Sequence, residues 1–376
     1  MAGRFATRGH AAALAVVERA VSAERPPHAL LLSGPERVGK TTLALDLATG
    51  LLCLADDPAA RPCRSCSACR RVASGNHPDL HRLAPEGAGG QIRLGQVQAL
   101  AAELALLPLE GRFRVALVEQ AQRLNLDAQH ALLKTLEEPP PKVVLILAAD
   151  EPAGLLPTVV SRCARLRLGA VGGAVIAELL AEAGLADAAR AATLGRLSGG
   201  RPGVALGLAA SPETLVTQAR LSRSLLDLLR ADRHTRLAAV PALLDDAASL
   251  GRAQERPAAP ADGTANDSAA DTPRSGRAEA TARVTPAERR AAVGALLAVW
   301  RLVARDLAFA ARGGRAAVQR HELLDELAGL EGAVDPDSVA RFVDRVESTS
   351  RALDGYVNPE LALDVLLLDW PAAEPA

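Results

Sequence analysis

The sequence has little lysine, few aromatic residues and no long apolar run. Only three of its 43 basic residues are lysine, and aromatic residues make up 2% of the 376 positions. A surface that binds single-stranded nucleic acid needs repeated aromatic faces for base stacking, so this scarcity argues against that class. The formal net charge of −1 also excludes a global basic footprint, so any contact with DNA must be local.

No apolar run approaches the roughly 18 uninterrupted residues that a membrane span needs. The nearest candidate, residues 143–149, has the length of a strand, and residues 1–10 lack the apolar core of a signal peptide. We therefore expect no membrane association and a cytoplasmic location. Hydrophobic residues still make up 49% of the chain, which is enough for two or three folded domains.

Strand-like and helix-like segments alternate in the first 168 residues. Buried strands are predicted at residues 28–33, 113–118 and 142–148, each of which is a short apolar run. Helical periodicity at residues 42–54 follows the first strand, and the helical segment 130–138 separates the other two. Strands that alternate with helices predict an α/β domain with a mainly parallel sheet.

After residue 168 the pattern becomes all-helical. Residues 251–285 contain almost no large apolar residue, so this segment cannot bury enough surface to offset its ordering entropy, and we predict a disordered insertion. Further helices are predicted before the first strand and after the insertion, at residues 11–24, 286–312, 318–330, 337–353 and 359–368.

A phosphate-binding motif follows the first strand and opens a helix. The segment GPERVGKT matches G-x-x-x-x-G-K-[ST]. Gly34 and Gly39 let the backbone fold round phosphates, and Lys40 supplies a compact positive charge. Thr41 and Thr42 begin the helix, where the Thr41 hydroxyl is available to Mg²⁺. The motif predicts a site for ATP or ADP with Mg²⁺.

Hydrolysis needs more than phosphate binding. A phosphate-loop NTPase also needs an acidic residue at the end of a neighbouring strand and a group that orients water. Glu119 ends the strand 113–118 and is placed to reach Mg²⁺. Gln120, however, stands where a general base is expected, and an amide does not accept a proton at neutral pH. We expect little or no hydrolysis by this chain alone.

Four of the five cysteines lie within one short segment. Their spacing is Cys53-x9-Cys63-x2-Cys66-x2-Cys69. Four soft ligands close together, in a chain with an odd number of cysteines, fit a metal site in a reducing compartment better than a disulfide framework. Tetrahedral zinc with four protein ligands has no open position, so the expected site is structural.

The residues around the cysteines leave two questions open. His77 and His81 are alternative ligands if Cys53 lies too far away, although His77 in Asn-His-Pro-Asp also fits a turn. Four arginines flank the cluster, and both a solvated loop and a local contact with DNA or a partner fit them: Arg61, Arg64, Arg70 and Arg71.

Six segments taken together resemble a known family. They are the phosphate loop, the four-cysteine insert, GNHPD at 75–79, ALLKTLEEP at 131–139, Ser161-Arg162-Cys163 and VNPELAL at 357–363. This set resembles the delta-prime family of bacterial DNA polymerase III clamp-loader subunits, which are AAA+ proteins. Single motifs are shared with the ATPase gamma/tau subunits, whereas their combination with this C-terminus is specific. The resemblance covers nearly the whole chain apart from the expected insertion.

The resemblance implies an architecture and a set of partners. It predicts a RecA-like AAA+ nucleotide-binding domain at residues 1–168 with a zinc module at 53–69, a small helical lid at 169–210 and a helical collar at 211–376. It also implies a five-subunit ring with gamma/tau and delta subunits that loads the sliding clamp onto primer-template DNA. The chain would then belong to a nucleotidyltransferase complex without itself being catalytic.

The resemblance further assigns roles to two arginines. In this family the Ser-Arg-Cys motif carries an arginine finger that reaches the ATP of a neighbouring subunit, so Arg162 is expected to act in trans. A planar, permanent charge suits that task. The alternative is that Arg162 only pairs with an acid at the edge of its domain. Arg201 stands where a lid arginine is expected to sense phosphate.

Two departures from the pattern of active ATPases favour a subunit that does not hydrolyse ATP. Where active relatives have Asp-Glu, this chain has Glu119-Gln120. Where they have threonines after the fourth strand, it has Ala149 and Asp150, which removes a sensor hydroxyl.

Two other functions stay open at this point. One is an ATP-hydrolysing subunit of the gamma/tau type, which the Glu119-Gln120 pair disfavours. The other, from the class of binding proteins, is a stand-alone zinc module that recognises DNA, which the net charge of −1 disfavours.

Overall fold

The computed structural model describes residues 4–86, 90–255, 286–314, 318, 320, 323–353 and 357–373. It divides into two compact units, Met1–Ala205 and Leu206–Ala376. The finer boundaries that we expected at residues 168 and 210 stay predictions. The first five residues of the expected 251–285 insertion continue a helix, and the rest of that segment lies outside the described residues.

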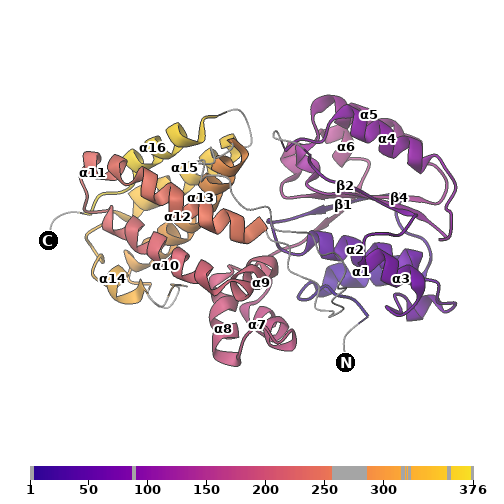
Figure 1. Ribbon diagram of the computed structural model, residues 1–376, viewed down its shortest axis with the longest axis horizontal. Helices are drawn as coiled ribbons and strands as arrows, with labels where there is room; N and C mark the ends of the chain where they lie inside the picture. The colour runs from indigo at the N-terminus through magenta and orange to yellow at the C-terminus, as the bar shows by residue number, and fades with distance from the viewer. Residues whose placement is uncertain are drawn as a thin grey trace, which may run out of the picture. The chain divides into compact units, whose positions relative to one another are not determined.

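The first unit is built on a five-stranded parallel sheet (Figure 1). The strand order is β2-β3-β4-β1-β5. The strands are β1 Ala29–Ser33, β2 Leu80–Leu83, β3 Arg114–Val118, β4 Val143–Ala149 and β5 Ala164–Arg167. Parallel strands joined by helices bring all their carboxyl ends to one edge of the sheet, which is where ligands bind in such folds.

Helices cover both faces of this sheet, α1, α2 and α3 on one face and α4, α5 and α6 on the other (Figure 1). Their bounds are α1 Ala11–Ser22, α2 Lys40–Leu52, α3 Ser67–Ala73, α4 Leu94–Leu104, α5 Leu126–Glu137 and α6 Pro157–Val160. Alternate residues of β1 point to opposite faces: Leu30 and Leu32 enter one core, whereas Ala29 and Leu31 enter the other. A strand buried on both sides reads as a continuous apolar run, which is why its position was predictable.

Two strands of the sheet were not predicted. These are β2 and β5, the two edge strands, each of four residues. Most residues of β5 are exposed, so its sequence ARLR lacks an apolar run. The remaining elements of this unit are short helical turns and helices: η1 Pro58–Ala60, η2 Ala121–Arg123, η3 Pro152–Gly154, α7 Gly173–Glu182, α8 Ala188–Leu197 and the start of α9 Pro202–Ala210.

The second unit is helical throughout its described residues. Its helices are α10 Pro212–Asp227, α11 Arg233–Ala238, α12 Val240–Glu255, α13 Pro286–Ala310, α14 Leu324–Ala328, α15 Pro336–Leu353 and α16 Pro359–Asp369. The prediction of a helix over residues 318–330 was wrong at its start, because Val318 and Arg320 are not helical and α14 begins only at Leu324. The other helices predicted for this half are confirmed within a few residues.

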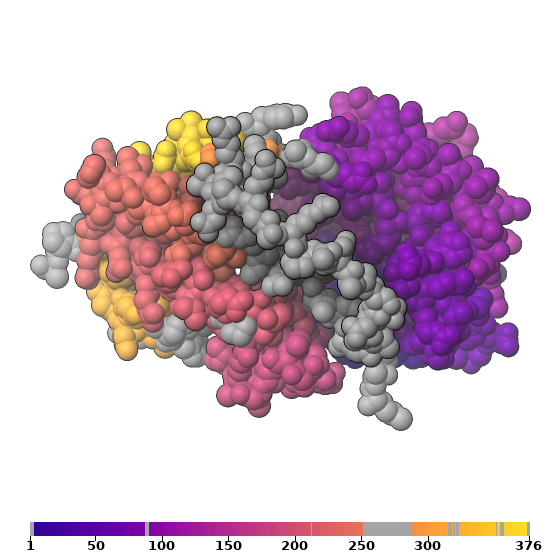
Figure 2. Space-filling model, viewed as in Figure 1, coloured from indigo at the N-terminus to yellow at the C-terminus, as the bar shows by residue number. Residues whose placement is uncertain are grey.

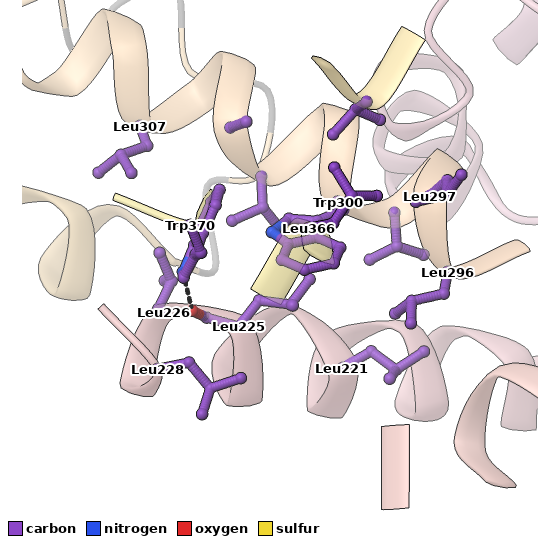
Figure 3. Close-up of a cluster of buried hydrophobic side chains, with 14 of the residues drawn as sticks. Leu221, Leu225, Leu226, Leu228, Leu296, Leu297, Trp300, Leu307, Leu366 and Trp370 are labelled. Atoms are coloured by element: carbon purple, nitrogen blue, oxygen red, sulfur yellow. Dashed lines mark hydrogen bonds between the residues drawn. The ribbon is translucent and has the colours of Figure 1, made fainter. Parts of the chain in front are cut away.

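An aromatic cluster lies in the core of the second unit (Figure 3). The ring centroids of Trp300, Phe342 and Trp370 are 4.6–5.4 Å apart, at tilted or edge-on angles. The indole N–H of Trp370 donates a 2.9 Å hydrogen bond to the carbonyl of Leu225. Trp370 directly follows α16, so this bond and the ring contacts fix the C-terminal helix to α10, α13 and α15.

Among the described residues, no helix combines the length and the apolar character that crossing a membrane requires.

Candidate nucleotide and metal sites

The phosphate loop lies at the carboxyl end of β1, between the strand and α2. Gly34 and Gly39 adopt φ values of 144° and 113°. Side chains rarely tolerate this region, and a Cβ on Gly34 would also lie 2.2 Å from the carbonyl oxygen of Leu168. Gly34 is therefore required both by its backbone conformation and by the close approach of the chain after β5.

Helix α2 begins at Lys40, so its free N–H groups and the positive end of its dipole face the loop. Thr41 and Thr42 occupy the first turn, as the motif predicted. Glycines at these backbone angles and a helix N-terminus are what a phosphate group requires. The cradle formed by the backbone thus fits a nucleotide phosphate.

The ammonium group of Lys40 is fully occupied by protein acceptors. Its Nζ donates to the carbonyl oxygens of Gly34 and Pro35, each at 2.8 Å, and to Oδ1 of Asp150 at 2.6 Å. An ammonium has three N–H donors, and all three are used here. The Lys40 side chain is only 8% exposed. In this state the carboxylate of Asp150 balances the positive charge of Lys40, and the ammonium has no N–H donor left for a phosphate.

Gln122 holds the carboxylate of Asp150 in place. The Gln122 side-chain amide donates to Oδ2 of Asp150 at 2.7 Å, and the Asp150 backbone N–H donates back to Gln122 Oε1 at 3.2 Å. The backbone at Gly154 packs against Gln122 so closely that a Cβ on residue 154 would lie 2.8 Å from Gln122 Cβ. The sequence pointed to Asp150 only as a lost sensor hydroxyl and did not point to Gln122 at all.

The two residues at the end of β3 do not form a hydrolytic pair. Glu119 Oε1 accepts from Arg82 on β2, at 3.0 Å from Nε and 2.6 Å from Nη2. Gln120 adopts a left-handed conformation, with φ of 49°, at the start of η2. The carboxylate expected to reach Mg²⁺ is therefore engaged by a cation, and the next side chain is an amide.

Arg201 lies at the start of α9, next to the phosphate loop. The backbone N–H of Gly203 donates to the carbonyl of Arg37, inside the loop, at 3.0 Å. Arg201 itself bonds through Nε to the carbonyl of Ser198 at 3.3 Å. The structure thus brings this arginine's segment to the loop, and its sensing role stays a prediction.

Arg162 follows α6 and pairs with an acid on α5. Its Nη2 lies 2.7 Å from Oε1 of Glu137, and its Nη1 donates to the carbonyl of Thr158 at 3.0 Å. The side chains of Arg162 and Glu137 are 37% and 51% exposed. Exposed ion pairs contribute about 0–1 kcal/mol, so this contact leaves Arg162 available to a partner.

The four clustered cysteines come together as predicted. The sulfur atoms of Cys53, Cys63, Cys66 and Cys69 all lie within 4.8 Å of one another. A tetrahedral zinc with Zn–S bonds of about 2.3 Å places its ligands about 3.8 Å apart. The donor set and its spacing therefore fit one metal ion, and no histidine is needed to complete it.

Backbone N–H groups support the sulfur atoms. Those of Cys63, Cys66 and Cys69 each donate, at 3.4 Å, to the sulfur of the cysteine before them. Hydrogen bonds from the backbone N–H groups of Ser65 and Cys66 lower the pKa of Cys63 to about 6. Burial, in contrast, raises the pKa of Cys53. The more exposed part of the cluster is thus prepared as thiolate, the form that binds metal.

The two histidines near the cluster have other partners. His77 is buried, and its Nδ1 accepts from the backbone N–H of Asp79 at 3.1 Å, so the interpretation of His77 as a turn residue holds. Burial lowers the pKa of His77, which keeps the ring neutral. His81 pairs with Glu103 at 2.5 Å. Neither belongs to the cysteine cluster.

The solvated-loop interpretation of the flanking arginines was wrong for Arg61, which is buried, whereas Arg64 and Arg71 are each 37% exposed and also pair with acids. Arg61 is buried and pairs with Glu24, Arg64 pairs with Asp46, and Arg71 donates to Glu110. Each arginine joins the cysteine segment to another part of the unit. These three guanidinium groups serve the fold and do not form a free basic patch.

Asp46 links the metal module to the nucleotide helix. This residue lies on α2 and is 1% exposed. Its carboxylate accepts from Arg64 in the cysteine segment, from the backbone N–H of Ala6 at 3.0 Å and from the N–H and hydroxyl of Thr7 at 2.8 and 2.6 Å. The cysteine segment and the residues before α1 that include Ala6 and Thr7, here called the N-terminal strap, are therefore held by the helix that begins at Lys40. Sequence reasoning missed Asp46, which no motif marks.

Asp79 explains one of the segments behind the family resemblance. Its buried carboxylate accepts from the backbone N–H groups of Leu109, Glu110 and Gly111 at 2.7–2.9 Å. Burial raises the pKa of Asp79, but these three donors and the charge of Arg114 outweigh it and lower the pKa overall. The Asn-His-Pro-Asp turn thus fixes the loop between α4 and β3.

The fold and the two sites define a class. A parallel sheet in this order, a phosphate loop after β1, a helix that begins at its lysine and a four-cysteine module are those of a RecA-like AAA+ phosphate-loop domain with a metal-binding insert. Residues 9–171 match the family model described as DNA polymerase III, delta subunit. Through this segment, which is less than half of its length, the chain is similar to that family.

Curated relatives agree with this assignment. The DNA polymerase III subunit delta' of Pseudomonas aeruginosa is 42% identical over 176 residues, which are 46% of this chain and 53% of that relative. The subunit delta' of Bacillus subtilis is 38% identical over 39% of this chain and 43% of its own length. The tau subunit of Escherichia coli is 36% identical over 42% of this chain and 24% of that protein. The chain thus spans about half the length of the delta' relatives it matches.

Solved structures give a more distant likeness. A gamma-subunit-related protein from Thermotoga maritima has a TM-score of 0.45 and 16% identity, with 94% of this chain and 97% of that chain covered. At that TM-score the strand order and the family match remain the basis of the assignment.

Proposed function

We propose that this chain is the delta-prime-type subunit of a DNA polymerase III clamp loader. In this role it joins gamma/tau and delta subunits in a five-subunit ring and helps to load the sliding clamp onto primed DNA. The match of residues 9–171 to the family model and the 38–42% identity to two delta' subunits support this proposal. The chain contributes structure and an arginine to the ring, and does not turn over ATP itself.

One observation carries the proposal that the chain does not hydrolyse ATP. The phosphate loop is intact, but the two residues beside it are not suited to hydrolysis. Glu119 pairs with Arg82, and the side-chain amide of Gln120 cannot accept a proton from water. Active phosphate-loop enzymes hold Mg²⁺ with an acid and orient water with a further residue. In a bound state Lys40 and the N–H groups of α2 would hold the phosphates, and Thr41 and Glu119 are the residues that the motif offers to Mg²⁺.

The second unit carries the proposed assembly role. Helix α16 buries Leu363, Leu366 and Leu367, and it also exposes two apolar side chains, Leu361 and Val365. Residues of the C-terminal segment, in yellow, reach the surface of this unit (Figure 2). Apolar side chains exposed next to one another on a helix can mark a surface that contacts a partner. We assign that face to a helix of a neighbouring ring subunit, in line with the collar that the family resemblance implies.

The four-cysteine module is proposed to hold a structural zinc ion. All four ligand positions come from the protein, so a bound zinc would have no open position for chemistry. Its role would be to fix the cysteine segment against α2 through Arg64 and Asp46.

An ATP-hydrolysing subunit of the gamma/tau type is the second candidate. The 36% identity to the tau subunit of Escherichia coli favours it. A stand-alone zinc module for DNA is less favoured, since three of the four arginines near the cysteines pair with acids of the same chain.

ATP turnover of the isolated chain distinguishes the first two candidates. We expect a rate no higher than that of the Lys40→Ala variant, because no group beside the loop can activate water. The measurement is steady-state phosphate release with Mg²⁺ present, with both proteins checked for folding by circular dichroism. A turnover near 1 s⁻¹ or above, within the ordinary range of enzymes, that Lys40→Ala abolishes would establish the gamma/tau-type alternative.

A further inference from the structure

We infer that Asp150 is a built-in competitor for nucleotide phosphate, so that this phosphate loop binds nucleotide only when the Lys40–Asp150 pair opens. The inference deepens the proposed function, because it rests on a nucleotide being the ligand of this loop. It concerns the chain's own residues: an intact cradle whose only lysine is already satisfied.

All three N–H donors of Lys40 are already used by acceptors of the protein. Lys40 Nζ has acceptors at 2.8, 2.8 and 2.6 Å, and the third is the carboxylate of Asp150. A phosphate oxygen that approached the loop would meet an ammonium with no free N–H and with its charge already balanced. It would also meet a second negative charge at the same place. Binding must therefore displace the carboxylate.

The carboxylate of Asp150 is not free to swing away. Gln122 bonds to its Oδ2 at 2.7 Å and accepts from its backbone N–H at 3.2 Å, so both oxygens and the main chain of Asp150 are engaged. Gly154 leaves just enough room for Gln122. The side chains of Lys40 and Asp150 are 8% and 32% exposed, so the contact is partly shielded from water. A shielded, charge-assisted bond resists opening more than a surface ion pair does.

The fold places Asp150 beside the phosphate loop. Asp150 follows β4, the strand that pairs directly with β1, which leads into the phosphate loop. A carboxylate at this point puts a negative charge beside the phosphate position, and Gln122 on η2 fixes its orientation. The competitor thus arises from two loops at the carboxyl edge of the sheet.

Equilibrium binding of a fluorescent ADP analogue to the full-length chain tests the inference. We expect Asp150→Asn to bind the analogue about tenfold more tightly than the wild type, since a charge-assisted hydrogen bond of this kind no longer has to be broken. The gain should appear both with Mg²⁺ and with a chelator present, because the competition is for Lys40. Gln122→Ala, which only loosens the carboxylate, should give a smaller gain.

Three controls make the result specific. Glu151→Gln removes the same charge from the adjacent, exposed residue and should leave the affinity unchanged. Lys40→Ala combined with Asp150→Asn should lose the gain, because the gain depends on the freed ammonium. Thermal melting checks that each variant is folded, and Gln122→Ala supplies an independent reading if Asp150→Asn melts early.

The outcomes separate the inference from the proposed function. Equal affinity of wild type and Asp150→Asn overturns the inference, whether both bind tightly or neither binds, and leaves the ring assignment to be judged by assembly. Weaker binding of Asp150→Asn only when Mg²⁺ is present also overturns it, and would make Asp150 a ligand of the cation. A gain of equal size in Glu151→Gln would reduce the effect to net charge and contradict the inference.

Discussion

Replacing Arg162 with alanine should lower ATP turnover at the ring site that this subunit completes by a factor on the order of 10³. The physical reason is that a guanidinium placed in trans stabilises charge on the transferring phosphoryl group, and no other donor replaces it. The measurement is the ATPase rate of reconstituted rings in which, apart from this chain, only the neighbouring subunit carries an intact phosphate loop.

Matched variants distinguish this role from a structural one. Arg165→Ala removes an exposed arginine three residues away, on β5, and should leave the ring rate unchanged. Glu137→Gln releases Arg162 from its 2.7 Å ion pair and should not lower the rate. Arg162→Lys keeps the charge but loses the planar fork, so its rate should stay low. If rings with Arg162→Ala assemble and turn over ATP as fast as the wild type, the finger assignment is wrong.

Removal of the metal should produce the largest loss of stability. We expect Cys66→Ser to reduce bound zinc from about one equivalent to nearly none, and to lower the free energy of unfolding of the first unit by about 4 kcal/mol when zinc is a thousandfold above its Kd. The cause is that the cysteine segment holds Arg64 against Asp46 on α2, so its loosening also frees the N-terminal strap. Metal analysis and chemical denaturation with and without a chelator measure both effects.

The fifth cysteine provides the control for this experiment. Cys163 is buried outside the cluster, with its sulfur 3.3 Å from the carbonyl of Val159. Cys163→Ser should keep about one equivalent of zinc, whatever its effect on packing. If wild-type protein prepared without chelator contains far less than one equivalent of zinc, the four-cysteine cluster is not a zinc site.

Local patterns predicted the centre of the first unit. The strand β1, the phosphate loop and α2 follow one another along the chain, so one motif with its flanks was enough. The same holds for the four cysteines, whose spacing within 17 positions implied that they share one metal ion. The edge strands β2 and β5 escaped prediction because an edge strand is short and partly exposed, and so lacks the apolar run that marks a central strand.

Contacts between distant positions were beyond sequence reasoning. Lys40 and Asp150 lie 110 positions apart, and only the strand order brings the ends of β1 and β4 together. The same holds for the arginines beside the cysteines, because Arg61 and Arg71 pair with acidic residues that lie 37 and 39 positions away in the sequence. From the sequence alone, a charged residue in a loop is expected to be solvated. Only the fold shows which charged residues form ion pairs.

Assembly with the other ring subunits is the decisive test of the proposed function. This chain should be mixed with purified gamma/tau and delta subunits, and the mixture analysed by size-exclusion chromatography with light scattering. We predict a stable complex that contains one copy of this chain and that does not form when the second unit is removed. Separate elution of this chain, under conditions where a delta' relative such as that of Pseudomonas aeruginosa enters the complex with its own partners, would contradict the account.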